Sequence, residues 1–375
     1  MNNEKPSVAL VHEFLTQLGG AERVLQELLY IYPDAPIHTL IYNGPKIKNL
    51  FSFYKKKVSF LQYIPFATDF HRWFLPLMPW AIESFNFKDY DIVLADASAF
   101  AKGVRVPKNT LLVCYCHTPT RYLWISGKDY VKSLKYPAFI KWLIPPVLSV
   151  VKKWDYKAAQ RPNYYIANSK TVQERIKKYY NRESVVVYPP VDTEFFHPEG
   201  RKENYFFAAS RLEPYKKIEL VVRAFNDLEL PLKIAGSGTD SARLRKIAKP
   251  NIEFLGRISD EELRRRYSES QAFIFPAEED AGIMPLEAMS CGTPVIAYAA
   301  GGALETVVGG KTGLFFNEQS VEAIKQAVQV FDVRRFDVEV IRNHAKQFDK
   351  LIFRQRIKSL VDNWYANFKA ANIEK

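Results

Sequence analysis

The chain has 375 residues, of which 47% are hydrophobic and 25% charged, and it carries a formal net charge of +12 with a pI near 9.3. This composition excludes a disordered chain and is typical of a folded protein long enough for two domains. Residues 1–190 hold 26 Lys and Arg against 14 Asp and Glu, whereas the remainder holds 27 of each, so the first half carries the whole charge excess.

The three cysteines (Cys114, Cys116 and Cys291) provide neither an even disulfide framework nor the paired spacing of a metal site. We therefore expect a reducing, cytoplasmic environment, with the Cys-Tyr-Cys pair in the core. The first residues lack a basic segment followed by an apolar run, so a signal peptide is not expected. No uninterrupted apolar run reaches the roughly 18 residues of a membrane-spanning helix.

The chain opens with a strand, a glycine turn and a helix. The apolar run 8–11 predicts a buried strand, Gly19 and Gly20 form the turn, and residues 21–30 have a helical pattern. This order is typical of a Rossmann-type unit. Glycines at this point let the backbone approach a ligand closely, and the free N–H groups of the helix favour an anion. A plain tight turn is the alternative.

Two stretches of the basic half are rich in aromatic residues, leucine and proline. They are residues 58–87 and 130–157, and Lys55, Lys56 and Lys57 precede the first of them. Such segments flanked by cations are typical of surfaces that lie on an anionic membrane, which we expect here. The alternative is that the aromatic side chains fill the core of this half. No nucleic-acid-binding motif accompanies the basic residues, so nucleic acid is not expected as a partner.

Further strands of the first half are predicted at residues 90–95, 111–116 and 164–167. His117 follows the second of these, at the end of a strand where open α/β sheets bind ligands, and this position favours a functional role over a structural one. Asp89 and Asp91 match the Asp-x-Asp pattern of some metal-dependent sugar transferases. They lead straight into an apolar strand, however, so we interpret them as the beginning of that strand and expect no metal site.

A domain boundary is expected at residues 188–200, where an apolar run ends in Pro189-Pro190 and the chain is held extended. A second α/β series follows, with strands predicted at residues 205–209, 232–235, 252–255 and 272–275. After Gly313 the pattern becomes mostly helical, and residues 350–368 predict a long amphipathic helix.

The second half places cations and carboxylates after successive strands. Arg211 and Lys216 lie in one loop, and both side chains can reach a diphosphate. In the strand–loop–helix–strand pattern of residues 275–306, Glu279 lies in the loop and Glu287 in the helix. Carboxylates in these places are suited to accept hydrogen bonds from sugar hydroxyls. A ligand with hydroxyls at both ends and a diphosphate between them, that is, a nucleotide sugar, fits this set.

With these residues in place, the sequence resembles family 4 of the retaining glycosyltransferases over nearly its whole length. Glu279 and Glu287 match the Glu-x7-Glu motif, followed by Cys-Gly-Thr-Pro-Val-Ile-Ala and Gly-Gly-Ala-Leu-Glu-Thr. Further matches are Ser-Arg-Leu-x-Pro-Tyr-Lys at 210–216, Phe-Leu-Gly-Arg at 254–257, Cys-His-Thr-Pro at 116–119 and Gly-Gly-Ala-Glu at 19–22. The residues of several of these segments look most like those of the mannosyltransferases of O-antigen and exopolysaccharide assembly, which use GDP-mannose. One departure, Ala281 where the family usually has Phe, bears on the packing of the loop and on sugar specificity.

The resemblance implies the GT-B fold of class α/β, in which two Rossmann-like domains face a central cleft and a C-terminal helix crosses back to the N-terminal domain. We expect residues 1–190, together with the helix 350–375, to form the domain that faces the acceptor and the membrane. Residues 191–349 are expected to form the domain that binds the nucleotide sugar.

The resemblance also implies how the donor would be held. Glu287 would bind the ribose, and Arg257 and Ile258 would lie near the base. Arg211 and Lys216 would neutralise the leaving diphosphate.

At the sugar end, Glu279 would hold the hydroxyls of the transferred sugar. The loop glycine Gly282 offers backbone N–H groups near a helix N-terminus, and the backbone at Gly282 and Ile283 would assist. His117 would contact the sugar near the reaction centre, and the Gly19-Gly20 pair would approach the phosphates and the acceptor.

We therefore expect an enzyme without cofactor or metal that transfers mannose from GDP-mannose, with retention, to a hydroxyl of a lipid-linked saccharide. It would work peripherally on the inner face of the plasma membrane, in the synthesis of a cell-surface polysaccharide or glycolipid. Two alternatives remain. One is a soluble family 4 transferase with a UDP-sugar and a small-molecule acceptor, and the other is a non-catalytic scaffold that binds nucleotide sugars.

Overall fold

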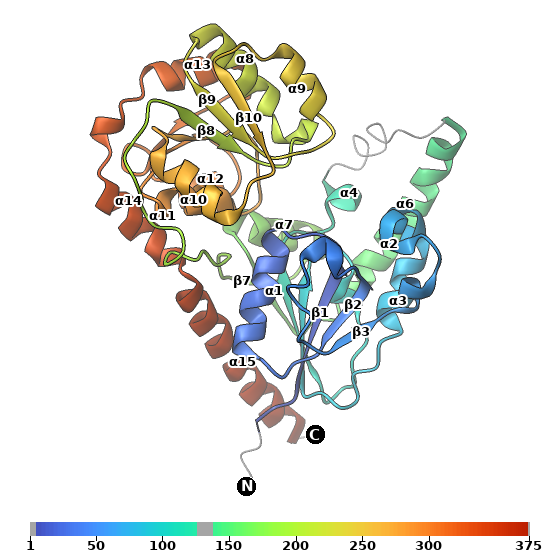
Figure 1. Cartoon of the computed structure of the whole chain (residues 1–375). Coiled ribbons are helices and arrows are strands. Elements are labelled where there is room, and N and C mark those ends of the chain that lie inside the picture. Colours follow the sequence, from blue (N-terminus) through green and yellow to red (C-terminus); the bar gives the residue numbers. More distant parts are fainter. Residues whose placement is uncertain (1–4, 126–137, 374–375) are drawn as a thin grey trace. The chain divides into compact units, whose positions relative to one another are not determined.

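The computed structural model describes residues 5–125 and 138–373 and divides the chain into two compact units (Figure 1). Unit 1 is residues 1–188 with 353–375, and unit 2 is residues 189–352. The boundaries expected from the sequence lie after residue 190 and before residue 350. The long helix α15 (Lys350–Ile373) begins at the end of unit 2, and its residues from Phe353 onward belong to unit 1.

Unit 1 is built on a seven-stranded parallel sheet in the order β3-β2-β1-β4-β5-β6-β7. Its strands are β1 (Val8–Leu15), β2 (Ile37–Tyr42), β3 (Lys56–Val58), β4 (Ile92–Ala97), β5 (Leu111–Cys116), β6 (Tyr164–Ala167) and β7 (Val185–Val186). The apolar pattern predicted β5 and β6 with their observed bounds. It missed β2, whose buried run includes His38 and Thr39, and β3, an edge strand that begins with two lysines.

Two helical layers cover this sheet because successive residues of a strand face opposite sides. On one side, α1 and the unit 1 part of α15 bury Leu25, Leu28, Phe353 and Ile357. On the other side, α3, α6 and α7 pack against Ala9, Val93 and Cys114. The helices of this unit before α15 are α1 (Gly20–Ile31), α2 (Ala67–Phe70), α3 (Met78–Glu83), α4 (Arg121–Trp124), α6 (Ala138–Ala158) and α7 (Lys170–Tyr180).

Unit 2 repeats the architecture with a six-stranded parallel sheet in the order β10-β9-β8-β11-β12-β13. Its strands are β8 (Phe206–Ala209), β9 (Leu232–Ala235), β10 (Ile252–Gly256), β11 (Phe273–Phe275), β12 (Val295–Tyr298) and β13 (Gly313–Phe316). The expectation of mostly helical structure after Gly313 is wrong at its first step. Residues 313–316 pair with β12 as an edge strand, and the helices begin only after them.

The helices of unit 2 form two layers, which Figure 1 shows above and below its sheet. One layer contains α8 (Ile218–Leu228), α9 (Ser241–Ile247) and α13 (Val321–Gln329). The other contains α10 (Asp260–Glu269), α11 (Ile283–Ser290), α12 (Ala303–Thr306) and α14 (Val338–Ala345). Both units are thus open parallel sheets with helices on both faces, a fold that binds ligands beyond the carboxyl ends of its strands.

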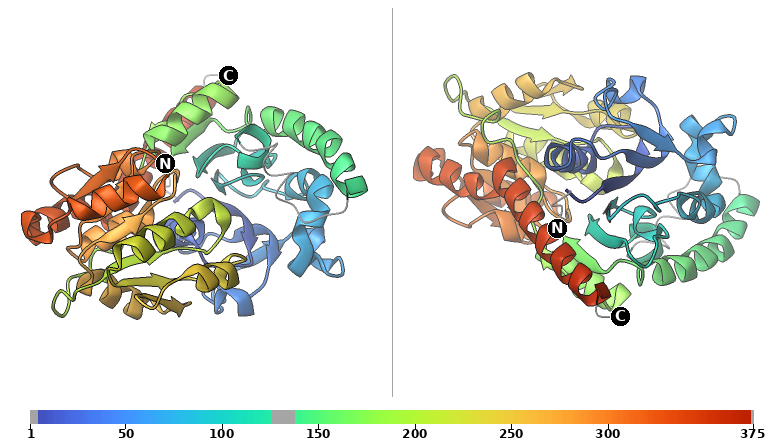
Figure 2. Two further views of the ribbon diagram at one scale, coloured as in Figure 1. Left: turned by 90° about the horizontal axis from the view of Figure 1, so that it is seen from above. Right: turned by 90° about the horizontal axis from the view of Figure 1, so that it is seen from below.

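The aromatic stretch 58–87 divides between the core and the surface of unit 1. Leu61, Met78 and Ile82 are buried, whereas Phe66 and Trp80 are 74% and 69% exposed. The views of Figures 1 and 2 agree that α2, α3 and α6 lie on the same side of the unit, and the indole N–H of Trp154 on α6 donates to Glu83 at the end of α3, at 2.6 Å. Of the second aromatic stretch, residues 130–137 lie outside the described residues. Within residues 5–125 and 138–373, we find no helix whose length and apolarity would let it cross a membrane.

Candidate functional site

The predicted donor-site residues of unit 2 come from loops that leave the carboxyl ends of its strands. Arg211 and Lys216 follow β8, Arg257 and Ile258 follow β10, and Glu279, Gly282 and Ile283 follow β11. Because all strands of this sheet are parallel, the three loops emerge at one edge of the sheet.

Within this edge, the structure brings Lys216 and Glu279 into direct contact. The ammonium group of Lys216 forms an ion pair with the carboxylate of Glu279, and the two side chains are 12% and 25% exposed. The ring of Tyr215 lies beside the same ammonium, 5.3 Å from Nζ to the ring centroid. A cation and a hydrogen-bond acceptor therefore stand side by side and within reach of solvent.

Arg211 is exposed, and its loop is fixed by the backbone of the neighbouring loop after β9. The amide of Leu212 donates to the carbonyl of Ser237 at 3.0 Å, and the guanidinium of Arg211 donates to the hydroxyl of Tyr215 at 2.8 Å. Tyr215 thus touches both predicted diphosphate ligands. Sequence reasoning noted Tyr215 only as part of a motif and assigned it no role.

The acidic loop 278–282 is held by the diglycine that follows β12. The amide of Gly302 donates to the carbonyl of Glu279 at 2.8 Å, and a Cβ on Gly302 would lie 2.6 Å from the Cα of Ala281. Ala281, at the position where the family usually has Phe, is 7% exposed against this backbone. Gly282 has a φ of +66° and directly precedes α11, so it turns the chain into that helix, of which Ile283 is the first residue.

Glu287 is buried on α11, unlike Glu279. Its side chain is 3% exposed, and the hydroxyl of Tyr267 on α10 donates to it at 3.3 Å. Arg257 is exposed, whereas Ile258 packs at the edge of the core on this side of the sheet. Tyr267, which is fully buried, was not predicted, because a buried tyrosine in an amphipathic helix is indistinguishable in sequence from a core residue.

In unit 1, His117 lies directly after β5 and bonds to a buried carboxylate. Its Nε2 is 2.6 Å from Oδ1 of Asp96 on β4, and Oδ2 of Asp96 is 2.7 Å from Nδ1 of His12 on β1. Neither Asp96 nor His12 was predicted as a site residue. A signal was present for Asp96, since it is the charged residue in the otherwise apolar run 92–97.

The predicted glycine turn of unit 1 belongs to the same neighbourhood. Gly20 is the first residue of α1, and a Cβ on Gly19 would lie 3.2 Å from the carboxylate of Glu22. That carboxylate is in turn 3.6 Å from Nε2 of His12. The space left by Gly19 is therefore next to the Glu22 side chain, and a ligand at this turn stays a prediction.

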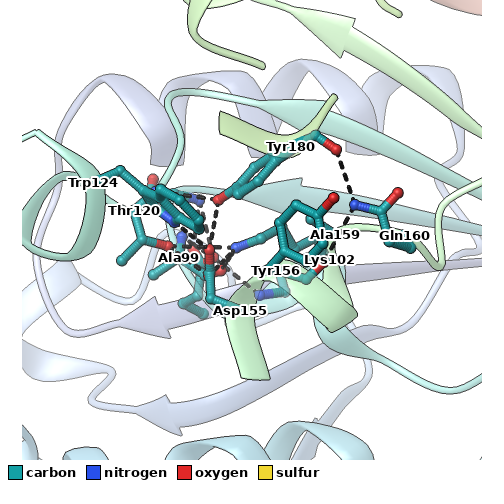
Figure 3. A network of polar contacts seen from close by, with 12 residues as sticks. Ala99, Lys102, Thr120, Trp124, Asp155, Tyr156, Ala159, Gln160 and Tyr180 are labelled. Atoms are coloured by element: carbon teal, nitrogen blue, oxygen red, sulfur yellow. Dashed lines mark hydrogen bonds and ion pairs between the residues drawn. The ribbon is translucent and has the colours of Figure 1, made fainter. Parts of the chain in front are cut away.

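The segment that follows His117 is anchored by a buried ion pair (Figure 3). Lys102 and Asp155 are 2% and 1% exposed, and their charged atoms are 2.6 Å apart. Asp155 also accepts hydrogen bonds from Thr120 at 2.8 Å, from the indole of Trp124 at 2.7 Å and from Tyr180 at 2.9 Å. These contacts tie the 120–124 segment to α6 and α7.

Comparison with known proteins identifies the chain. The family model described as Glycosyltransferase Family 4 matches residues 18–195, and the one described as Glycosyl transferases group 1 matches residues 191–331, so together they span well over half of the sequence. The chain belongs to glycosyltransferase family 4. Its two open parallel sheets with helices on both faces have the GT-B fold, as the motifs predicted.

Among characterised family members, the chain is 26% identical over 224 residues to the O-antigen chain mannosyltransferase RfbU of Salmonella typhimurium. It is 32% identical over 170 residues to the GDP-mannose-dependent alpha-(1-6)-phosphatidylinositol monomannoside mannosyltransferase of Mycolicibacterium smegmatis. The matches cover 56% and 37% of this chain, and 62% and 44% of the relatives. The chain thus matches less than two thirds of the length of either relative.

Solved structures support the fold over almost the full length. The crystal structure of Anabaena HepE with UDP and glucose superimposes with a TM-score of 0.70 at 17% identity, covering 95% of this chain and 99% of that one. At this identity the likeness concerns the arrangement of strands and helices only.

Proposed function

We propose that this family 4 enzyme is a retaining mannosyltransferase that moves mannose from GDP-mannose to a hydroxyl of a lipid-linked saccharide. The observation that carries the proposal is the contact between Lys216 and Glu279 at the carboxyl edge of the unit 2 sheet. A sugar diphosphate has an anionic group directly next to a ring of hydroxyls, and this pair offers a cation directly next to a carboxylate. The names of the relatives from Salmonella and Mycolicibacterium favour mannose as the sugar, and that of the second favours GDP-mannose as the donor.

The remaining residues of the edge extend this assignment along the donor. Arg211 would join Lys216 on the diphosphate, with Tyr215 holding the two cations in place. The buried carboxylate of Glu287 would accept hydrogen bonds from the ribose. Arg257 and Ile258 would flank the base.

At the sugar end, the backbone N–H groups of Gly282 and Ile283 at the beginning of α11 would support Glu279. In unit 1, His117 would contact the sugar, and the Gly19-Gly20 turn would approach the phosphates and the acceptor.

The chemistry would proceed with retention at the anomeric carbon. The bond from this carbon to the diphosphate oxygen breaks, the acceptor oxygen bonds to the same face, and the acceptor proton passes to the departing phosphate. Glu279 serves as a ligand of the sugar hydroxyls and not as a nucleophile. The protein contributes by positioning the reactants and by stabilising the negative charge that grows on the diphosphate.

We propose that no metal ion takes part, so that EDTA would leave turnover unchanged. Activity lost in EDTA and restored by Mg²⁺ would contradict this.

A donor panel tests the proposal. The enzyme is incubated with GDP-mannose, UDP-glucose or UDP-N-acetylglucosamine and a lipid-linked saccharide, and nucleotide release is measured with the anomeric configuration of the product. Turnover of GDP-mannose with an α-linked product is expected. Preference for a UDP-sugar would favour the alternative donor, which the UDP and glucose of the Anabaena structure make the natural second candidate. Binding of donors without turnover of any would favour the non-catalytic scaffold.

We further propose that unit 1 lies on the cytoplasmic face of an anionic membrane. In α2, in α3, between them and before α2, aromatic side chains project into solvent: Phe53, Tyr63, Phe66, Phe70, Trp73 and Trp80 are 98%, 79%, 74%, 55%, 54% and 69% exposed. Exposed lysines lie near them in the sequence at positions 46, 48, 55 and 57. Rings that enter the headgroup layer beside cations that meet anionic lipid are the features of an interfacial surface.

Not every predicted cation belongs to this surface. The ammonium group of Lys56 donates to the backbone carbonyls of Phe51, Ser52 and Tyr54 and is thereby used within the fold. Flotation with vesicles that contain anionic lipid measures the binding. A variant with Phe66 and Trp73 replaced by Ser is expected to bind more weakly, and no binding of the native protein at low salt would remove this part of the proposal.

A further inference from the structure

Four polar side chains from four elements of unit 1 form a continuous line that ends at His117. Asp96 lies between two histidines, with Oδ1 at 2.6 Å from Nε2 of His117 and Oδ2 at 2.7 Å from Nδ1 of His12. Nε2 of His12 is 3.6 Å from Oε1 of Glu22, an ion-pair distance. The line therefore runs from α1 across β1 and β4 to the end of β5.

The sheet holds this line rigidly. His12 and Asp96 are directly opposite each other in the pairing of β1 with β4, and Asp96 is opposite Tyr115, two residues before His117. The side chains of His12 and Asp96 are 3% and 0% exposed, whereas that of His117 is 14% exposed. His117 is thus the member of the trio that reaches the surface, at the carboxyl edge of the sheet.

The contacts determine which nitrogen of His117 faces outward. An ionised carboxylate only accepts hydrogen bonds, so both nitrogens that touch Asp96 must carry protons. Nε2 of His117 is therefore an N–H directed inward, and Nδ1 is the ring nitrogen that has no hydrogen-bond partner in the described part of the chain. Burying two carboxylates and two imidazoles is tolerable when their charges are paired in this way.

The electrostatics agree with this arrangement. Burial lowers the pKa of His117, but the charge of Asp96 and the hydrogen bond to it outweigh burial and leave that pKa above its ordinary value. Burial likewise opposes the charge on His12, yet Asp96 and Glu22 raise the pKa of His12 well above normal. Burial raises the pKa of Asp96, and the two histidines more than reverse this.

We propose that Asp96 and His12 are positioning residues that hold His117 with Nε2 inward and present Nδ1–H as a charge-assisted donor to an oxygen of the bound sugar diphosphate. The nature of that ligand rests on the function proposed above, whereas the orientation and the proton rest only on the network. Asp96 supplies the negative charge that keeps His117 protonated. His12 occupies the second oxygen of Asp96 and, being cationic itself, limits how far the pKa of His117 rises.

The other charged and aromatic groups around His117 do not replace this network. Glu13 on β1 acts on His117 through its charge, but its carboxylate accepts the amides of Ser98, Ala99 and Ala101 at 2.7 to 3.0 Å. The ring of Tyr115 lies edge-on to the imidazole, with 5.3 Å between centroids. Asp96 remains the acceptor that His117 touches.

The first test is a nitrogen-15 NMR titration of the imidazoles in the free full-length protein, with the His117 signals assigned by their loss in His117→Gln. On deprotonation the remaining proton is expected on Nε2. Asp96→Asn is expected to lower the pKa of His117, and His12→Gln to raise it, because the first removes a negative neighbour and the second a positive one. His38→Phe, which changes a buried histidine on the neighbouring strand β2, should leave His117 unaffected.

The opposite shifts test the network, and the kinetic experiment below tests the hydrogen bond from His117 to the ligand. A pKa of His117 that Asp96→Asn leaves unchanged overturns the proposal. If that variant does not fold, an unchanged pKa in His12→Gln has the same meaning, as does a native tautomer with the proton on Nδ1.

The second test is kinetic. Asp96→Asn is expected to lower kcat roughly 10- to 100-fold, the worth of a hydrogen bond to a charged group, with the acceptor KM little changed. The pH at which kcat falls on the alkaline side should move down with the pKa of His117. If no donor is turned over, the proposed function fails while the titration still decides the network. If nucleotide sugars are turned over and Asp96→Asn leaves kcat unchanged, only the proposed hydrogen bond from His117 to the ligand is contradicted.

Discussion

Lys216 and Glu279 lie 63 residues apart in the sequence and form an ion pair at the carboxyl edge of the unit 2 sheet. The pair joins the loop after β8 to the loop after β11. In the free protein the ammonium and the carboxylate neutralise each other's charge. A sugar diphosphate can take over both roles, with its phosphate meeting the ammonium and its hydroxyls meeting the carboxylate. On the proposed function, the ion pair would hold these two groups in place before the ligand binds.

Lys216→Ala separates a role in turnover from one in folding. We expect kcat to fall about 100- to 1,000-fold, as when a group that stabilises developing charge is removed. The free energy of unfolding should change by at most about 1 kcal/mol, because the pair is partly exposed. Lys325→Ala, which removes an exposed ion pair with Asp227 in the same unit, is the control and should leave kcat unchanged. Near-native turnover in Lys216→Ala would contradict the assignment.

Tyr267→Phe tests whether Glu287 is a ligand of the donor. The change keeps the buried ring and removes the hydroxyl that donates to Glu287 at 3.3 Å. Because that hydrogen bond orients the carboxylate, we expect the donor KM to rise roughly 3- to 10-fold with kcat little affected. Glu287→Gln should raise the donor KM further. Equal donor KM values in all three proteins would argue that Glu287 only supports the packing of α10 and α11.

Much of this edge could be predicted from the sequence because parallel sheets place loops at the carboxyl ends of their strands. Arg211, Lys216 and Glu279 follow apolar runs that are strands, so their neighbourhood followed from the pattern. The contact between His12 and Asp96 could not be predicted in this way. It depends on the register of β1 against β4, across 84 residues, which no local pattern specifies.

Two of the missed strands, β3 and β13, have a common physical cause. Residues 56–58 and 313–316 form edge strands that pair on one side only, so they need no long apolar run. The first carries lysines and was interpreted as a basic flank, and the second is followed by helices and was absorbed into them. Buried strands such as 111–116 can be predicted from the sequence because they are apolar on both faces.

Gly302→Ala should displace the acidic loop. The new Cβ would lie 2.6 Å from Ala281, where only backbone can yield, so Glu279 would move away from Lys216. We expect kcat/KM for the donor to fall at least about 10-fold and unit 2 to lose about 1 to 3 kcal/mol of stability, as for an overpacked site. The control is Gly309→Ala, whose Cβ would meet the ring of Phe315 at an ordinary 3.5 Å. Equal activity of the two variants would show that the diglycine does not position the loop.

Asp155→Asn should destabilise unit 1 because it leaves Lys102 as an unpaired buried charge. The expected loss is about 3 to 5 kcal/mol, and the double variant Lys102→Met with Asp155→Leu should recover part of it. All six tryptophans lie in unit 1, so their fluorescence in urea reports the unfolding of that unit alone. Asp69→Asn, which breaks an exposed ion pair with Lys46, should change little. A similar urea midpoint for Asp155→Asn and the native protein would contradict the network of Figure 3.

The stability of unit 1 should fall in mild acid because of His38. This histidine is fully buried on β2 beside the rings of Phe87 and Tyr90, and burial, aided by Lys57, lowers its pKa to about 4. Above pH 6.5 the group is neutral in both states. As the pH falls from about 6.5 to about 4, His38 binds a proton in the unfolded chain but not in the folded protein. The free energy of unfolding therefore falls by about 3 kcal/mol. His38→Phe should remove this part of the pH dependence of the tryptophan-detected urea transition, and an identical pH dependence in the variant would show that His38 titrates normally.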